Sequence, residues 1–423
     1  MGAVAKGQAI LVVGHACKLA MSLAVASLLA RNLVPADFAF VALVTTIFIV
    51  GGEVLDMGTM AISVRDVAAG RIEERAALGK LISARRGIGL GAALAVALLA
   101  QSGYVHDPDQ RVVMLVVACG VFLLHLHAYQ LVFQVRQAFG RLTALGLASQ
   151  AAFLVASAVA VGARAGGAIL GLFVVMREAF MIAGSRRMAL GLMGERVHAR
   201  WNEPGVKALL QAGWMVGLAG AAYKLAAYVG VFILWNAEPS QLASFSAAQR
   251  LLAPLGDMAW LFVTPLIAAM STTASQGLEP FRLQLERCFK FLLAAAALVA
   301  LSGYFLAPLL LRIIYGETYA SGPLSAVGPV RWLAFGYLFA IASPVLVVAE
   351  IVHEKTRTLL VVALACLAVN LAVNAWAIPL YGAEGPAMAF VAAEAFVLAV
   401  FLARALHSRH LSLAGLVRIG AHR

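Results

Sequence analysis

Apolar runs of about twenty residues recur from one end of this chain to the other, and they constrain the fold more than any other feature. A helix rises 1.5 Å per residue, so about 20 apolar residues cross the roughly 30 Å hydrocarbon core of a bilayer. We therefore predict membrane-spanning helices at residues 8–30, 38–62, 86–103, 111–134, 143–163, 166–184, 208–235, 241–270, 289–310, 329–352, 358–378 and 385–404.

The composition favours a membrane protein over a soluble one. Hydrophobic residues make up 63% of the 423 residues and charged residues 12%, whereas roughly a quarter of an ordinary soluble domain is charged. A single soluble core stops growing at about 250 to 300 residues, so this apolar excess has to face lipid. The sequence predicts an all-α membrane protein of about 12 transmembrane helices.

The distribution of positive charge predicts the orientation of the chain in the membrane. The formal net charge is +12, which in a soluble protein would suggest nucleic acid as a partner. Here most Lys and Arg residues lie in the loops on one side of the predicted helices, and such loops stay in the cytoplasm. We expect both termini to be cytoplasmic, and no nucleic acid is needed as a partner.

A basic segment at the middle of the chain, "SRRMALGLMGERVHARWNEPGVK", separates six predicted helices from the next six. None of the loops is long enough to hold a soluble domain. We predict two six-helix bundles with a linker and a tail, divided as follows: bundle 1–190, cytoplasmic linker 191–206, bundle 207–404 and cytoplasmic tail 405–423.

Several charged residues fall inside the predicted helices, where an ionisable group is costly and usually marks a functional path. Lys18, Lys224 and Arg250 are the basic candidates for lining a polar cavity. Asp257 lies seven residues after Arg250 and therefore on the same helix face, and Pro254 between them can kink the helix. Bracing between helices, or snorkelling of a long side chain to the interface, is the alternative interpretation.

Three acidic residues are candidates for ion coupling or for tuning such a cavity. Glu53 and Asp56 share a helix face, so they could take up protons, pair with the nearby Arg65, or cap a helix end at the interface. Glu394 lies in the last predicted helix and is either a proton site or a bond to a neighbouring helix.

Other polar residues in the predicted helices are better explained by packing. Arg177 and Glu178 are adjacent and point about 100° apart, so we expect them to brace helices. His125 and His127 are two residues apart and diverge on a helix, which makes them a poor metal pair. Small residues four apart allow close helix contact, and they occur at Gly167 with Gly171 and at Gly213 with Gly217.

Patterns that would indicate catalysis are missing from the sequence. The chain has no GxxxxGK[ST] phosphate-binding loop, so it carries no ATPase of its own. Asp107 and Asp109 flank a proline in a short loop, which turn chemistry explains. The four cysteines have no spacing typical of a zinc site or disulfide framework. We expect no enzyme activity, no cofactor and no metal site.

Four stretches resemble a known family of transporters. They are "LLARNLVPADFAFVALV" (28–44), "EVLDMGTMAISVRDVA" (53–68), "LLRIIYGETYASGPL" (310–324) and "AIPLYGAEGPAMAFVAAE" (377–394). These stretches are similar to the polysaccharide (Wzx-type) flippases of the multidrug/oligosaccharidyl-lipid/polysaccharide exporter superfamily. The resemblance implies two six-helix bundles around a central cavity lined chiefly by the first, second, seventh and eighth helices.

The same resemblance implies a function. Members of the family move an undecaprenyl-diphosphate-linked oligosaccharide across the bacterial cytoplasmic (inner) membrane by alternating access, for O-antigen or exopolysaccharide biosynthesis. Lys18, Lys224 and Arg250 then become candidates for the diphosphate or acidic sugars, and Asp257 for tuning or proton coupling. Partners would be the lipid-linked oligosaccharide, membrane lipids, and the polymerase and glycosyltransferases. The alternative is an ion-coupled multidrug exporter with the same two-bundle plan.

Overall fold

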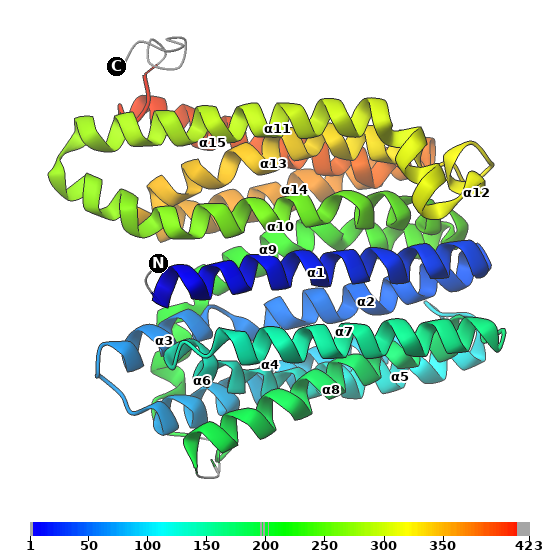
Figure 1. Cartoon of the computed structure of the whole chain (residues 1–423), viewed down its shortest axis with the longest axis horizontal. Helices are drawn as coiled ribbons and strands as arrows, with labels where there is room; N and C mark the ends of the chain where they lie inside the picture. The colour runs from blue at the N-terminus through cyan, green and yellow to red at the C-terminus, as the bar shows by residue number, and fades with distance from the viewer. Residues whose placement is uncertain (1–2, 195–196, 198, 202, 413–423) are drawn as a thin grey trace. The chain divides into compact units, whose positions relative to one another are not determined.

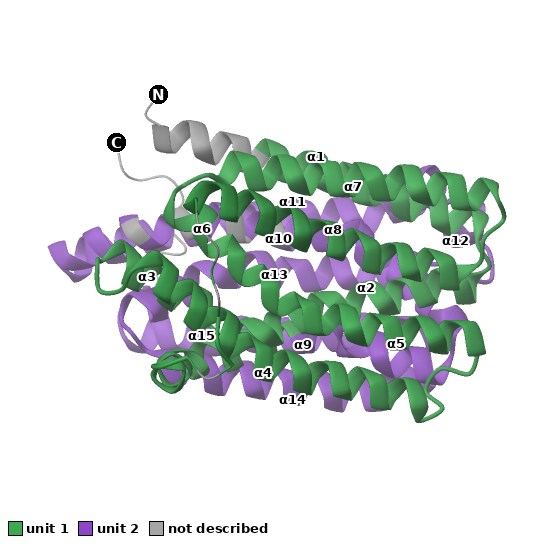
Figure 2. Ribbon diagram, turned by 90° about the horizontal axis from the view of Figure 1, so that it is seen from below, with its two compact units in different colours: residues 1–224 green, residues 225–423 purple. Residues whose placement is uncertain are grey.

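The structure is a computed structural model that describes residues 3–194, 197, 199–201 and 203–412. The chain divides into two compact units, Met1–Lys224 (unit 1) and Leu225–Arg423 (unit 2), drawn in green and purple in Figure 2. Within the described ranges the regular elements are all helices, without a strand. The predicted all-α fold is therefore confirmed (Figure 1).

The described part of unit 1 contains nine helical segments and the first part of a tenth. They are α1 (Ala3–Asn32), α2 (Pro35–Asp56), α3 (Thr59–Ala68), α4 (Glu74–Gln101), α5 (Pro108–Leu123), the 3₁₀ helix η1 (Leu124–Tyr129), α6 (Gln130–Val135), α7 (Phe139–Gly162), α8 (Gly167–Met193) and the first part of α9 (Val206–Ala237).

Unit 2 begins inside α9 and continues to the end of the described chain. Its further helices are α10 (Pro239–Gln276), α11 (Leu278–Tyr315), α12 (Glu317–Ala320), α13 (Val327–Val352), α14 (Thr356–Tyr381) and α15 (Glu384–His407). Helix α13 packs along α10, α11 and α15, and α14 packs along α15.

Eleven helical segments of the described chain are long and apolar enough to cross a membrane. The remaining predicted span, 241–270, lies inside the 38-residue helix α10, which is not one of those eleven. The chain is thus a multi-pass membrane protein of the predicted kind.

The segment between the second and third predicted spans, residues 63–85, is largely helical. It contains the end of α3, and α4 already begins at Glu74 rather than at residue 86. Hydropathy detects the part of a helix that lipid can cover, whereas Lys, Arg and Glu are good helix formers and extend the helix into the polar region. The sequence therefore locates the spans better than the helix ends.

Helix α2 ends because Met57 and Gly58 adopt left-handed backbone angles, with φ of 43° and 68°. A Cβ added to Gly58 would lie 2.8 Å from the carbonyl oxygen of Gly213, and a Cβ on Gly217 would overlap the backbone of Met57. Only glycine permits this approach. The small-residue pattern at Gly213 and Gly217 is thus a close packing contact, as predicted.

Candidate functional site

The carboxylate of Asp56 forms a partly buried ion pair at the break between α2 and α3. Its Oδ1 accepts a hydrogen bond from Nη2 of Arg85 on α4, whose side chain is only 5% exposed. The same oxygen accepts from the backbone N–H of Met60 at 3.3 Å, so Asp56 also caps the first turn of α3. Arg65 instead pairs with Asp66 at 3.2 Å. The partner of Asp56 is therefore Arg85 and not Arg65.

Glu53 lies one turn earlier on α2 and faces α9. Its Oε1 is 3.3 Å from the place where a Cβ on Gly220 would stand, and the charge of Arg85 also acts on Glu53. Lys224 follows Gly220 by four residues and therefore shares its helix face. Unit 1 thus brings Glu53 and Lys224 to the same α2–α9 packing face.

A second polar cluster surrounds η1, which interrupts the predicted span 111–134. His125 is buried, and its Nδ1 hydrogen-bonds to the carbonyl oxygen of Phe122 at 2.7 Å. Nδ1 of His127 lies 3.3 Å from the side-chain amide nitrogen of Gln130. Nε2 of His127 is buried and has no hydrogen-bond partner among the residues that the structure describes. A 3₁₀ segment inside a longer helix often marks a hinge or strained sequence.

Arg177 and Glu178 of α8 pair with each other. The Arg177 guanidinium donates to Glu178 Oε1 at 2.5 and 3.1 Å, and it also lies 5.3 Å from the ring centroid of Phe153 on α7. The charge of Glu178 interacts with both His127 and Lys18. Lys18, which the sequence identified as a cavity candidate, therefore belongs to a cluster with two residues that were expected only to pack.

In unit 2, Arg250 lies near the end of α11. Its charge acts on Tyr315, the last residue of that helix, which is 1% exposed. The neighbouring Gln249 donates its side-chain N–H to the carbonyl oxygen of Ala227 on α9 at 3.1 Å. The backbone of Asp257 is part of α10, but its side chain lies outside the described residues.

Glu394 of α15 is 3% exposed and faces α14, where its charge acts on Cys366. Asn370 and Asn374 continue the same face of α14 and are each 1% exposed. Asn374 Nδ2 donates to Asn370 Oδ1 at 2.6 Å. The sequence analysis missed both asparagines, although two Asn residues four apart in an otherwise apolar helix were the signal for a buried polar row.

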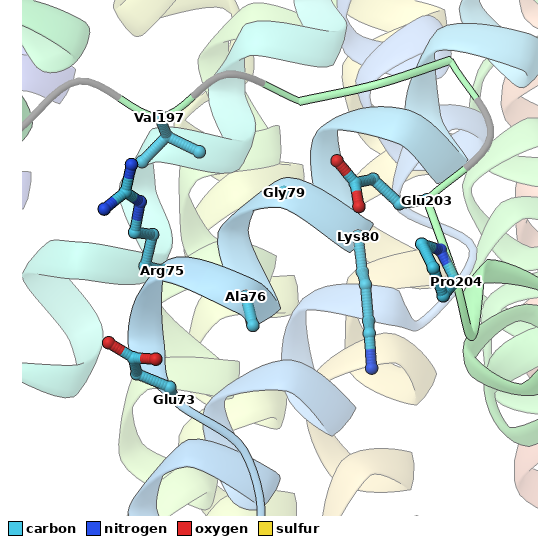
Figure 3. Close-up of a pocket in the computed structure, with 8 residues that line it drawn as sticks. All are labelled: Glu73, Arg75, Ala76, Gly79, Lys80, Val197, Glu203 and Pro204. Carbon is cyan, nitrogen blue, oxygen red and sulfur yellow. The ribbon is translucent and has the colours of Figure 1, made fainter.

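A polar pocket of about 440 Å³ lies between the start of α4 and the segment that follows α8 (Figure 3). It is lined by residues of both charges together with small residues, namely Glu73, Arg75, Ala76, Gly79, Lys80, Val197, Glu203 and Pro204. Opposite charges in similar number give this pocket no preference for an anion.

The returning chain is fixed to α4 beside that pocket. Ser83 Oγ donates to the carbonyl oxygen of Trp201 at 2.7 Å, and Arg86 Nη1 donates to that of Ala199 at 2.9 Å. The Arg86 guanidinium also lies 5.6 Å from the Trp201 ring centroid. These contacts hold the segment after α8 against α4 within unit 1.

The predicted site residues form separate groups within the units. In unit 1, Glu53 and Asp56 lie near the end of α2 and Lys224 lies on α9, whereas the charge of Lys18 acts on the residues at η1 and α8. In unit 2, Arg250 lies beside α11 and Glu394 beside α14. No group of three or more His, Cys, Asp or Glu side chains suited to a metal was found in the described part of the chain.

Comparison with solved structures gives matches over nearly the whole chain. A lipid II flippase MurJ in an inward closed conformation matches 96% of this chain and 88% of its own, with a TM-score of 0.71 and 13% identity. An inward-facing multidrug resistance MATE family transporter of the MOP superfamily matches 93% of this chain and 94% of its own, with a TM-score of 0.68 and 12% identity. The chain has the fold of these transporters.

A third match comes from Vibrio cholerae. A mutant of the MATE transporter VcmN matches 95% of this chain and 96% of its own, with a TM-score of 0.60 and 17% identity. No protein-family profile and no curated protein sequence matches this chain. At these identities the likeness concerns the fold that lipid flippases and drug exporters share.

Proposed function

We propose that this protein is a flippase that carries an undecaprenyl-diphosphate-linked oligosaccharide from the inner to the outer leaflet of a bacterial cytoplasmic membrane. The observation that carries the proposal is the fold match to a lipid II flippase over 96% of the chain. The resemblance of four sequence stretches to polysaccharide flippases supports the same substrate class. The product would serve O-antigen or exopolysaccharide synthesis.

The intramembrane charges suit an anionic lipid head group. Lys and Arg are the natural partners of phosphate oxygens because they form charge-assisted hydrogen bonds. In this proposal Lys18, Lys224 and Arg250 bind the diphosphate or acidic sugars during alternating access. Glu53, Asp56, Asp257 and Glu394 then tune those cations or couple transport to an ion gradient.

A multidrug exporter is the second candidate, because two of the reported structural matches are MATE transporters. Exporters of cationic drugs favour acidic and aromatic groups in the cavity. The residues proposed to contact the substrate, Lys18, Lys224 and Arg250, are all basic, and this favours the anionic lipid.

The proposed orientation places both chain ends in the cytoplasm, according to the distribution of Lys and Arg. Polysaccharide polymerase and glycosyltransferases acting on the same lipid are the proposed protein partners. Accessibility labelling of cysteines introduced near position 412 and between α6 and α7, at residues 136–138, would test this orientation. Both positions should be labelled from the cytoplasmic side.

The fate of lipid-linked oligosaccharide in cells lacking the gene tests the function. Leaflet-resolved labelling should show the lipid accumulating on the cytoplasmic face, with normal distribution restored by the intact gene. A normal distribution in the deletion strain, together with increased sensitivity to cationic drugs, would replace the flippase with the multidrug exporter.

A further inference from the structure

We propose that the polar pocket between the start of α4 and the segment after α8 binds the head group of a zwitterionic phospholipid of the phosphoethanolamine type. The phosphate lies beside the cations of the pocket and the ammonium beside its carboxylates. The cations are Arg75 and Lys80, and the carboxylates are Glu73 and Glu203. The inference concerns a lipid held at the surface of unit 1, so it goes beyond the proposed transport and does not depend on it.

The pocket has the size of a ligand site. Its volume of about 440 Å³ falls in the range of about 300 to 1,000 Å³ that is common for small-molecule sites. The α4 side of the lining includes Ala76 and Gly79, which fill little of this space. A Cβ on Gly79 would lie 3.8 Å from Oε1 of Glu203, so a larger side chain there would enter the space in front of this carboxylate.

Two of the charged side chains are held in place by the segment after α8, which hydrogen bonds from α4 already fix. Glu203 Oε1 accepts a hydrogen bond from the backbone N–H of Arg200 at 2.8 Å. Nζ of Lys80 lies 3.0 Å from the place where a Cβ on Gly205 would stand. Gly205 has a φ of 87°, a conformation that favours glycine. Glu203 and Lys80 are therefore parts of a preformed site.

Charged groups of opposite sign stand on both sides of the pocket. Glu73 and Arg75 lie on one side and Lys80 and Glu203 on the other, and the side chains of Lys80 and Glu203 point apart (Figure 3). None of the ion pairs between described residues joins Lys80 to Glu203. A ligand of one charge would meet a repelling group beside each attracting one. A ligand that carries both charges can bind the cations and the carboxylates together.

The pocket lies close to the level of lipid head groups. Lys80 precedes residue 86, where the predicted apolar span begins, by six residues or about 9 Å along the helix. Head groups extend the bilayer by roughly 5 to 8 Å on each side of the hydrocarbon. Trp201 is 65% exposed and its ring lies 5.6 Å from the Arg86 guanidinium, and tryptophan is enriched at the membrane–water interface. A phospholipid of the cytoplasmic leaflet, in the proposed orientation, can therefore reach the pocket with its acyl chains in the bilayer.

Hydrogen bonding distinguishes phosphoethanolamine from other common head groups. Its primary ammonium carries three N–H donors, as the Lys side chain does, and the carboxylates of Glu73 and Glu203 can accept them. The trimethylammonium of phosphocholine has no N–H donor, and phosphoglycerol has no cation. The pocket should therefore prefer phosphatidylethanolamine to phosphatidylcholine and phosphatidylglycerol.

The test is native mass spectrometry of the full-length protein in detergent, after incubation with an equimolar mixture of these three lipids. The native protein should retain phosphatidylethanolamine in preference to the other two. Thermal unfolding of every variant in the same detergent shows that it is folded. The measurement needs no transported substrate, so its failure is distinguishable from a failure of the lipid-labelling test of function.

Three variants change the pocket in different ways. K80Q removes a cation, and E203Q removes a carboxylate charge while keeping an oxygen for the Arg200 N–H. Each should retain about tenfold less phosphatidylethanolamine, because one charge-assisted hydrogen bond is lost. A76L fills the pocket without removing a charge, at an exposed helical position where Leu is well tolerated, and should reduce retention at least as much. The control is R71Q, since the Arg71 side chain is 61% exposed and pairs with Asp66 outside the pocket, and it should retain the lipid as the native protein does.

Equal retention of the three lipids by the native protein, or a preference for phosphatidylglycerol, would overturn the proposal. Phosphatidylethanolamine retention that survives in E203Q and A76L would place the lipid elsewhere and overturn it as well. A loss in K80Q alone would indicate attraction of phosphate by one cation, which contradicts recognition of both charges.

Discussion

Arg85 of α4 carries a buried charge at the break between α2 and α3. Its side chain is 5% exposed, and it binds Asp56 while lying near Glu53. A carboxylate left in such a place without a cation is poorly solvated, so removing one partner of a buried ion pair is more harmful than its formation is beneficial. The ion pair between Asp56 and Arg85 therefore holds the end of α2 against α4.

Replacing Arg85 with Ala should lower the free energy of unfolding by about 3 kcal/mol. This value is at the low end of the range for breaking a buried ion pair, because Asp56 keeps partial contact with solvent. Thermal unfolding in detergent measures the loss. R65A is the matched control, since Arg65 has a side chain 60% exposed in its pair with Asp66 and should change stability by at most about 0.5 kcal/mol. Equal losses in the two variants would contradict this assignment.

At the level of elements, the break after α2 depends on the glycines of α9. Gly217 lies directly against the backbone of Met57, which cannot move aside as a side chain would. The contact therefore fixes how close α9 approaches the α2–α3 corner.

G217A should destabilise the protein by about 1 to 3 kcal/mol, because the added methyl group overpacks a backbone contact. Gly91 in α4 provides the control, as a Cβ there meets nothing within 4 Å. G91A should be neutral or stabilising by up to about 1 kcal/mol, since Ala is the better helix former. Chemical-denaturation midpoints of the two variants decide the matter, and a stable G217A would rule out the tight contact.

Within unit 2, the segment after α15 packs on Phe281 of α11 and on His353, which follows α13, through an aromatic cluster. The rings of His353 and His410 stack with centroids 4.4 Å apart, and both meet the edge of Phe281 at 5.2 and 5.3 Å. The backbone N–H and hydroxyl of Ser412 both donate to Glu286 Oε1 at 3.0 Å. The chain is thus attached at least as far as residue 412.

This docking should weaken in acid. Burial, followed by the charges of His353 and Lys355, lowers the pKa of His410, with Glu350 opposing them. The unfolded or undocked residue binds protons more readily, so docking is most stable above the ordinary histidine pKa of about 6.5 and is lost as the pH falls below it. Hydrogen exchange of residues 408–412 at several pH values measures the change.

H410F keeps an aromatic ring at this position but removes its charge. Exchange in that variant should depend much less on pH than in the native protein. Unchanged acid sensitivity in H410F would show that His410 is not the responsible group.

At the level of the whole molecule, the sequence predicted the features that a lipid environment requires, namely the membrane-spanning helices. Twenty apolar residues in a row leave few alternatives to a spanning helix, so the helices and their order followed from hydropathy. The helix ends and the 3₁₀ segment at His125 and His127 did not follow. These features depend on which face of a helix packs against a neighbouring helix. In a membrane protein the faces that meet lipid and the faces that meet other helices are both apolar, so a single sequence does not distinguish them.

The candidate site was predictable in its residue types but only partly in its pairings. Depth in the membrane singled out Lys18 and Glu394, and the structure finds a polar neighbour for each in Glu178 and Cys366. Of the alternatives open for Asp56, the structure shows the helix cap but not the pair with Arg65. Its partner Arg85 lies 29 residues away in sequence, beyond any local pattern. Long-range charge pairing requires the packed helices themselves.

At this scale, replacing a cationic residue of the proposed substrate site should impair transport without impairing membrane insertion. K18A and R250A each remove one charge-assisted contact proposed for the diphosphate, worth about 1.5 to 3 kcal/mol, so export of lipid-linked oligosaccharide should fall roughly tenfold or more. Membrane levels of both variants should match the native protein, because removing an ionisable group favours insertion. K207A, an exposed lysine at the start of α9, should export normally. Normal export by both K18A and R250A would rule out substrate binding by these cations. The transported molecule would then be of another chemical class.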